Sequence, residues 1–132
     1  MNTIFSIGHG RRAFSEFLQV LKKNKIDILV DVRTFPRSRF CPQFNRSFMS
    51  AELQNVGIVY EFRGDQLGGL GENINYDEAI DEITNMAKKG KRVCVCCSET
   101  DYKKCHRHTM LEPSFGKNKI KVKHLGLISG VF

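Results

Sequence analysis

Short apolar runs alternate along the chain with longer segments whose apolar residues recur at helical spacing. Five runs are β-branched or continuously apolar and predict strands, at residues 3–7, 27–32, 57–62, 92–97 and 120–125. Four segments predict helices, at 15–23 with Ser15 as cap, 48–55, 76–89, and 105–111 ending before Pro113. Strands that alternate with helices favour a parallel sheet. We therefore expect an α/β fold with a mostly parallel central sheet flanked by helices.

The composition is that of a globular protein. With 132 residues, 41% hydrophobic and 27% charged, the chain predicts a single compact domain over residues 1–132 that needs no disulfides to fold. No apolar run approaches the ~20 residues that span a bilayer, and residues 1–5 do not resemble a secretory signal. Three of the five cysteines are crowded into residues 94–97, unlike a disulfide framework. We expect reduced thiols, a cytoplasmic location and no membrane partner.

The formal net charge of +7 permits attraction to phosphate, nucleotides or nucleic acid. Much of the excess is dispersed lysine, which favours a solvated surface. The segment 33–46 is more specific because it interleaves arginines with Phe35, Phe40 and Phe44. Arginine with aromatic residues suits base stacking and phosphate contact, and three phenylalanines also suit a loop folded onto its own domain. A nucleotide or nucleic acid is thus a candidate partner.

Reactive and charged residues follow the predicted ends of three strands. In open parallel sheets, ligands bind beyond the carboxyl ends of the strands, so these residues are expected to converge on one site. The candidates for catalysis are Cys97, Glu99, Cys105 and His106, and those for substrate binding are His9, Asp31, Arg33, Ser38 and Arg107.

The leading hypothesis is a cysteine enzyme that acts on an anionic substrate bearing a phosphate or a nucleotide. Cys97 would be the nucleophile or a redox thiol, because His106 or Arg107 nearby would lower its pKa. His106 would be the acid or base, with Glu99 as its orienting partner or a second acid/base. Arg33 and Arg107 would bind the anion.

Other interpretations, mainly structural, are open for several of these residues. Cys97 could be a core residue, as we expect for Cys94 and Cys96. Asp31 and Arg33 could form a structural ion pair, and Cys105-His106-Arg107 could be a helix start that holds an anion or only caps the backbone.

Two other classes of function remain open. One is a nucleotide or nucleic-acid binding module without chemistry, and the other is a structural zinc domain. The possible ligands Cys97, Glu99, Cys105, His106 and His108 lack the tight cysteine pairs of a strong zinc signal. We therefore expect no metal and no cofactor. The oligomeric state stays open.

The motifs resemble those of a known family, the domain of unknown function DUF488. The resemblance extends from about residue 3 to 125 and is carried by Ile7-Gly8-His9, Leu29-Val30-Asp31-Val32-Arg33 with Pro36 and Ser38, Leu67-Gly68-Gly69, and Cys97-Ser98-Glu99 followed by Cys105-His106-Arg107. It implies motif roles for Asp31, Arg33, Cys97, Glu99, Cys105, His106 and Arg107, and it implies no settled activity.

A strand followed by Asp-Val-Arg, and a later strand ending in cysteine before a helix, is also similar to rhodanese-type sulfurtransferases. Those enzymes use a six-residue loop, whereas ten positions separate Cys97 from Arg107 here. The likeness to rhodaneses is therefore an analogy only.

Overall fold

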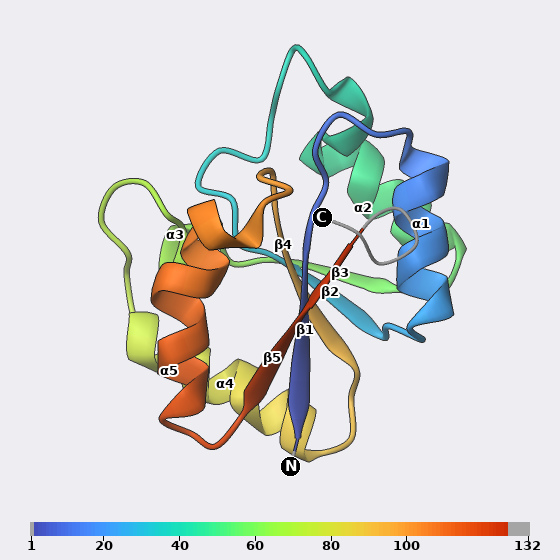
Figure 1. Cartoon of the computed structure of the whole chain (residues 1–132). Coiled ribbons are helices and arrows are strands. Elements are labelled where there is room, and N and C mark those ends of the chain that lie inside the picture. Colours follow the sequence, from blue (N-terminus) through green and yellow to red (C-terminus); the bar gives the residue numbers. More distant parts are fainter. Residues whose placement is uncertain (1, 127–132) are drawn as a thin grey trace.

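Five parallel strands form the central sheet of the computed structural model, which describes residues 2–126 (Figure 1). In chain order they are β1 (Thr3–Gly8), β2 (Ile28–Asp31), β3 (Val59–Phe62), β4 (Val93–Cys97) and β5 (Lys121–Leu125). Their order across the sheet is β3-β2-β4-β1-β5, and each neighbouring pair is parallel. The predicted α/β class is confirmed, with a sheet that is parallel throughout.

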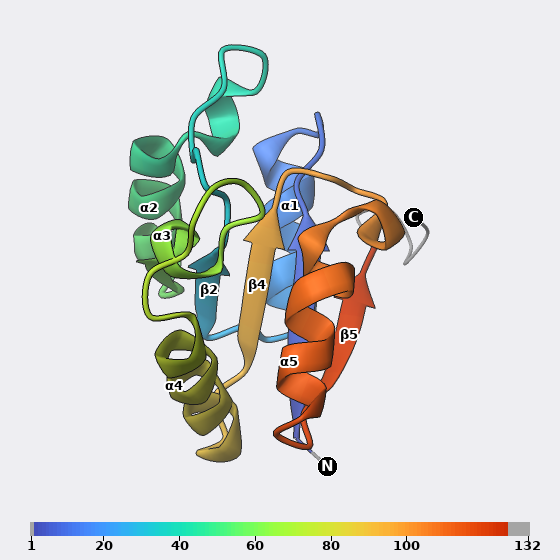
Figure 2. The same ribbon diagram turned by 90° about the vertical axis from the view of Figure 1, so that its left-hand side faces the viewer.

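Helices cover both faces of the sheet (Figures 1 and 2). One face carries α1 (Phe14–Lys23) and α2 (Arg46–Asn55), and the other carries α3 (Gly64–Leu67), α4 (Tyr76–Lys88) and α5 (Glu112–Gly116). Because strand side chains alternate in direction, Cys94 and Cys96 enter the core under α1 and α2, while Cys97 enters the other core. Cys94 and Cys96 are fully buried, as expected. Among the described helices, none has the length and apolarity to cross a membrane.

Helix boundaries are where the sequence prediction was wrong. Ser15 does not cap α1, which begins at Phe14 after an extended Ala13 without a side-chain cap. Pro113 does not stop the next helix either. A π-helical turn over Arg107–Leu111 continues into α5, with Pro113 in the first turn of α5. Proline is common in the first turn of an α-helix, and here it lies at the junction where the π-helical turn changes into α5.

The glycine-rich segment 66–71 begins inside a helix, since α3 ends at Leu67. The other predicted elements lie within two residues of their predicted ends. Such offsets are usual for boundaries.

The carboxyl ends of β1, β2 and β4 lie together at one edge of the sheet. Gly8 is level with Cys97, and Asp31 is level with Cys96. A Cβ on Gly8 would lie 1.8 Å from the carbonyl oxygen of Glu99, so glycine lets the loop after β4 cross the end of β1. Backbone hydrogen bonds from His9 to Cys97 and from Gly10 to Ser98 then join the two loops.

Candidate functional site

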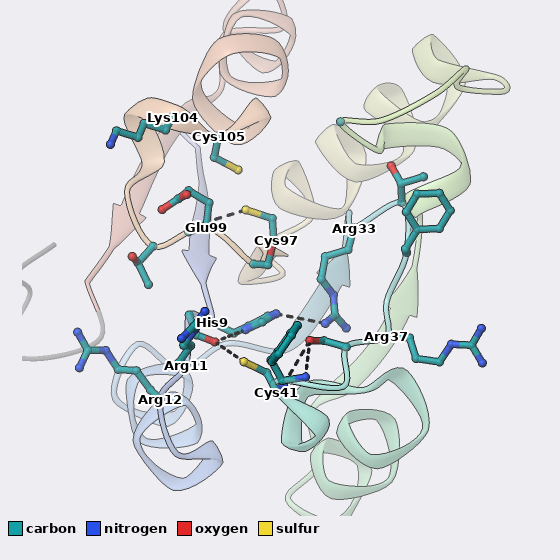
Figure 3. A pocket seen from close by; sticks show the side chains of 18 of the residues that line it. His9, Arg11, Arg12, Arg33, Arg37, Cys41, Cys97, Glu99, Lys104 and Cys105 are labelled. Carbon is teal, nitrogen blue, oxygen red and sulfur yellow. Dashed lines mark hydrogen bonds between the residues drawn. The ribbon is translucent and has the colours of Figure 1, made fainter.

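A pocket of about 1070 Å³ opens at this edge of the sheet, between the loops that follow β1, β2 and β4 (Figure 3). Its lining contains more basic than acidic side chains, namely Arg11, Arg12, Arg33, Arg37 and Lys104 against Glu16 and Glu99. Clefts lined by one sign of charge concentrate ions of the opposite sign. The charged side chains that line the pocket are mainly basic.

Two thiols face each other in the wall of this pocket (Figure 3). Cys97 is the last residue of β4, and Cys105 precedes the π-helical turn. Their sulfur atoms and a ring nitrogen of His106 all lie within 4.8 Å of one another. Tertiary structure thus brings together three of the four predicted catalytic residues.

Arg107 supports the sulfur of Cys105 from inside the protein. Its side chain is fully buried. Its backbone N–H and its Nε donate to Cys105 Sγ at 3.5 and 3.3 Å, and Nη2 donates to the carbonyl of Glu99 at 2.7 Å. Arg107 is not among the residues that line the pocket. We had expected it to hold the anion of a substrate, and instead its charge faces a sulfur atom of the protein.

The negative charge of the thiol pair lies on Cys105. A hydrogen bond from the Cys97 thiol lowers the pKa of Cys105 far below its usual value; burial opposes this shift, and contacts with His106 and Arg107 add to it. The same hydrogen bond, together with burial, raises the pKa of Cys97. The expectation of a low pKa at Cys97 is therefore wrong, because the donors converge on Cys105.

The Cys97 thiol has a second acceptor within reach, the carbonyl of Glu99 at 3.8 Å. A charged acceptor forms the stronger hydrogen bond. The Cys97 thiol therefore has two acceptors, and a thiolate on Cys105 is the stronger of them.

The two ring nitrogens of His106 face different partners. Its Nε2 donates to the carbonyl of Val32 at 3.2 Å, which leaves Nδ1 facing Cys105 Sγ at 3.6 Å. A Cβ on Gly69 would lie 2.8 Å from this Nδ1, and one on Gly68 would lie 2.2 Å from Thr34 Oγ1. Gly69 is therefore the surface against which the imidazole packs, and Gly68 packs against Thr34.

Asp31 and Arg33 form the structural ion pair that was one of the two readings of the Asp-Val-Arg motif. Arg33 donates to both carboxylate oxygens at 2.8 and 2.7 Å, and Asp31 is fully buried. The remaining Nη1 of Arg33 donates to His9 Nε2 at 3.3 Å. Burial lowers the pKa of His9 to about 4, so His9 is neutral and can accept this bond. Arg33 and His9 line the pocket, whereas Asp31 holds Arg33 from behind.

Ser38 and Glu99 also line the pocket, and each hydrogen-bonds to the backbone. Ser38 Oγ accepts from the N–H groups of Phe40 and Cys41 at 3.1 and 3.2 Å. Glu99 Oε1 accepts from the N–H of Asp101 at 3.0 Å, rather than from His106. The carboxylate of Glu99 therefore holds the loop after β4. The carbonyl of Val32, and not Glu99, orients His106.

The phenylalanines of the basic segment divide into two kinds. Phe44 is buried and stacks on the ring of His9, with centroids 4.3 Å apart. Phe35 and Phe40 are 71% and 80% exposed and line the pocket. The reading in which all three fold onto the domain therefore holds for Phe44 alone.

Donor atoms for a metal are present, but their surroundings favour a thiolate. Cys97, Cys105 and His106 are close enough to share an ion, while the predicted ligand His108 lies in a different group. The guanidinium of Arg107, 3.3 Å from Cys105 Sγ, already supplies the positive charge that a metal would bring. A divalent cation would be repelled by this buried cation.

Sequence reasoning did not assign Arg12, Cys41, Lys104 or Gly69 to the site. A signal existed for Arg12, since it follows His9-Gly10-Arg11 at the end of β1. Gly69 was visible only as part of a glycine-rich segment. Its neighbour His106 lies far along the chain, so the sequence did not indicate the contact.

The family model described as "Domain of unknown function DUF488" matches residues 13–75. This match confirms the resemblance to that family expected from the motifs. It includes β2 with Asp31 and Arg33 and the Gly68-Gly69 pair, and it ends before the segment from Cys97 to Arg107. A search of curated proteins and a search of solved structures found no match.

Proposed function

We propose that the chain is an enzyme that uses the thiolate of Cys105 as a nucleophile on an anionic substrate. The observation that carries the proposal is the fully buried guanidinium of Arg107 against Cys105 Sγ. A buried charge without a counter-charge is strongly destabilising, and the salt bridges within residues 2–126 do not include Arg107. A thiolate on Cys105 supplies the missing negative charge.

The thiol pair and His106 suffice for a two-step substitution. Cys105 Sγ forms a bond to an electrophilic atom of the substrate, such as a phosphorus or an acyl carbon. The leaving group departs with the bonding electrons and takes a proton from Nδ1 of protonated His106. Water then displaces Cys105, which regains its charge while His106 regains a proton. Cys97 keeps the nucleophile ionised and does not itself attack.

The basic residues around the pocket would hold the anionic part of the substrate. Figure 3 shows Arg12 and Arg37 extending to opposite sides of the opening, with Arg33 and His9 between them. Arg33 is hydrogen-bonded to Asp31. The other basic side chains of the pocket, which lie nearer its rim, are therefore the ones left to contact a ligand. We assign the anion to that rim, close enough to Cys105 for a phosphate or carboxylate to orient the reacting atom.

The test is the pH dependence of alkylation by iodoacetamide at each cysteine, read by mass spectrometry on the native protein. We expect Cys105 to react at a rate that is constant down to well below about pH 8.5, the pKa of an ordinary thiol. Cys41, which also lines the pocket, is the internal reference. An ordinary pH profile at Cys105, or preferential alkylation of Cys97, would contradict the assignment.

Preference for anions is tested separately by comparing iodoacetate with iodoacetamide. Relative to the same ratio for free glutathione, the ratio of the two rates at Cys105 should be raised by the basic rim and should fall with added salt. Lys104→Gln should lower it. An unchanged ratio would contradict the proposal of an anionic substrate but not the proposal of a thiolate on Cys105.

A second candidate is a nucleic-acid binding module, favoured by Phe35 and Phe40 at the pocket opening beside Arg37. Exposed aromatic rings stack on bases, and arginine contacts phosphate. A fluorescent single-stranded oligonucleotide should then bind with an affinity that falls steeply with salt, and Phe35→Ala with Phe40→Ala should weaken it. Two results together would favour this module over the enzyme. Oligonucleotide binding would persist in Cys105→Ser, and Cys105 of the wild type would react like an ordinary thiol.

A further inference from the structure

A second cluster of ligand side chains lies outside the pocket, where the helix after Cys105 meets the edge strand β5. It consists of His108, Glu112 and His124, whose donor atoms all lie within 4.8 Å of one another. His108 Nδ1 and His124 Nε2 lie 2.8 and 2.7 Å from the same oxygen, Oε1 of Glu112. None of the three lines the pocket. Two imidazoles and one carboxylate therefore converge on one point.

Local structure explains why these side chains meet. His108 and Glu112 are four residues apart across the junction of the π-helical turn and α5, so they lie on one helix face. His124 comes from β5, which is paired with β1 so that His124 lies opposite Ser6. Single π-helical turns occur frequently at functional sites.

The ring of His124 is held in one orientation. It stacks on Tyr102 with centroids 4.1 Å apart and an angle of 8° between the planes. Its Nδ1 is hydrogen-bonded to Ser6 Oγ, which turns Nε2 toward Glu112. A second partner that fixes the free nitrogen of a ligand histidine is the usual arrangement around protein-bound metals.

We propose that His108, Glu112 and His124 bind a zinc ion, with a fourth position left open to water. Two histidines and a carboxylate are a ligand set that zinc accepts in tetrahedral geometry. Bonds of about 2.0–2.2 Å place tetrahedral ligands about 3.3 Å apart, so the carboxylate has to move away from the two rings to admit the ion among the three donor atoms. His108 and Glu112 are 44% and 36% exposed, which leaves the ion a path from solvent, while His124 is anchored at 9%.

The zinc site and the thiol pair are connected but share no ligand. Ser6 Oγ contacts His124 Nδ1 and accepts from Arg107 Nη1 at 3.2 Å, and Arg107 in turn holds Cys105. The ion would pin β5 to the helix that carries Arg107. The proposal does not depend on the proposed function, since zinc can bind whether or not Cys105 is a nucleophile.

The experiment is calorimetric titration of the metal-free protein with zinc sulfate, in the wild type and in a Cys97→Ser, Cys105→Ser double variant. We expect one high-affinity equivalent of zinc in both proteins. His108→Ala should weaken it by at least the roughly 10–100-fold that loss of an outer partner alone costs, and Glu112→Gln should act likewise. Glu78→Gln, an exposed carboxylate on α4, is the matched control and should leave the affinity unchanged.

Cobalt provides a second readout that needs no variant. A nitrogen and oxygen site gives visible d–d absorption without the near-ultraviolet charge-transfer band of a cobalt–thiolate bond. That spectrum on the wild-type protein supports the site. A thiolate band, loss of zinc in the double cysteine variant, equal affinity in His108→Ala, or no binding at all would overturn it.

Discussion

Two buried arginines lie at the carboxyl edge of the sheet, and they are neutralised in different ways. Arg33, at the end of β2, is held by two hydrogen bonds to the carboxylate of Asp31. Arg107, in the π-helical turn, donates to the sulfur of Cys105 and to backbone and hydroxyl oxygens. A carboxylate beside arginine is ionised at neutral pH and chemically inert, whereas a thiolate in the same position is a nucleophile.

The difference also decides how each pair responds to a mutation. We call Arg33 with Asp31 the Arg33 half of the site, and Arg107 with Cys105 the Arg107 half. Neither guanidinium loses its proton under ordinary conditions. Asp31 must therefore stay charged for Arg33 to remain buried without penalty. Cys105 can bind a proton when its cation is removed, so the Arg107 half loses reactivity before it loses the fold. The Arg33 half supports the structure of the site, and the proposed chemistry belongs to the Arg107 half.

The largest expected effect comes from breaking the structural half. Asp31→Asn keeps the shape of the side chain and leaves the guanidinium of Arg33 buried without a counter-charge. We expect the free energy of unfolding in urea to fall by about 3–5 kcal/mol. Glu82→Gln is the control, since Glu82 pairs with Arg63 while 44% exposed, and it should cost less than about 1 kcal/mol. Equal losses in the two variants would remove the distinction between the two halves.

The chemical half is tested by Arg107→Met, which removes the cation and keeps an unbranched apolar side chain. The pKa of Cys105 should rise by about 1–3 units, the usual effect of losing a neighbouring opposite charge. The pH midpoint of iodoacetamide alkylation at Cys105 should then rise by the same amount, which a full pH profile of the rate detects. Ellman titration in denaturant confirms that the thiol is intact. An unaltered midpoint in folded protein would show that Arg107 does not stabilise a thiolate.

Cys97 is expected to act as a donor, and a pair of variants separates that role from packing. Cys97→Ala removes the hydrogen bond to Cys105, while Cys97→Ser keeps a hydroxyl donor. Loss of a bond to a charged group costs about 1.5–3 kcal/mol, so Cys97→Ala should raise the pKa of Cys105 by about one to two units. Cys97→Ser should change it less. If the two variants titrate alike, the donor role is wrong.

The smallest effect is expected at the surface that supports His106. Gly69→Ala places a methyl group against Nδ1, and a side chain pushed off its rotamer costs about 0.5–1.5 kcal/mol. The pH midpoint of alkylation at Cys105 should rise by about 0.4–1.1 units, the shift to which this energy corresponds when the contact with His106 is weakened. Gly116→Ala, with open space around its Cβ position, is the matched control and should react like the wild type.

Much of the fold could be predicted from the sequence, because buried strands are short apolar runs that need no distant information to identify. The placement of Cys94 and Cys96 in the core and the convergence of residues from three strand ends followed from the same logic. Helix ends were less predictable. The continuous passage from the π-helical turn through Pro113 depends on how Leu111 and Phe115 pack into the core, and a local reading of proline as a stop missed it.

The sequence alone indicated that Cys97, Cys105 and His106 would meet at the carboxyl edge, since parallel strands end together and the motifs follow those ends. Only the tertiary structure decided which thiol carries the charge and which arginine holds it there. Cys97 and Cys105 are similar in sequence context, each with charged residues nearby. Their pKa values differ because hydrogen-bond donors reach one sulfur and not the other, and such contacts depend on distances of a few ångströms between segments that no local pattern records.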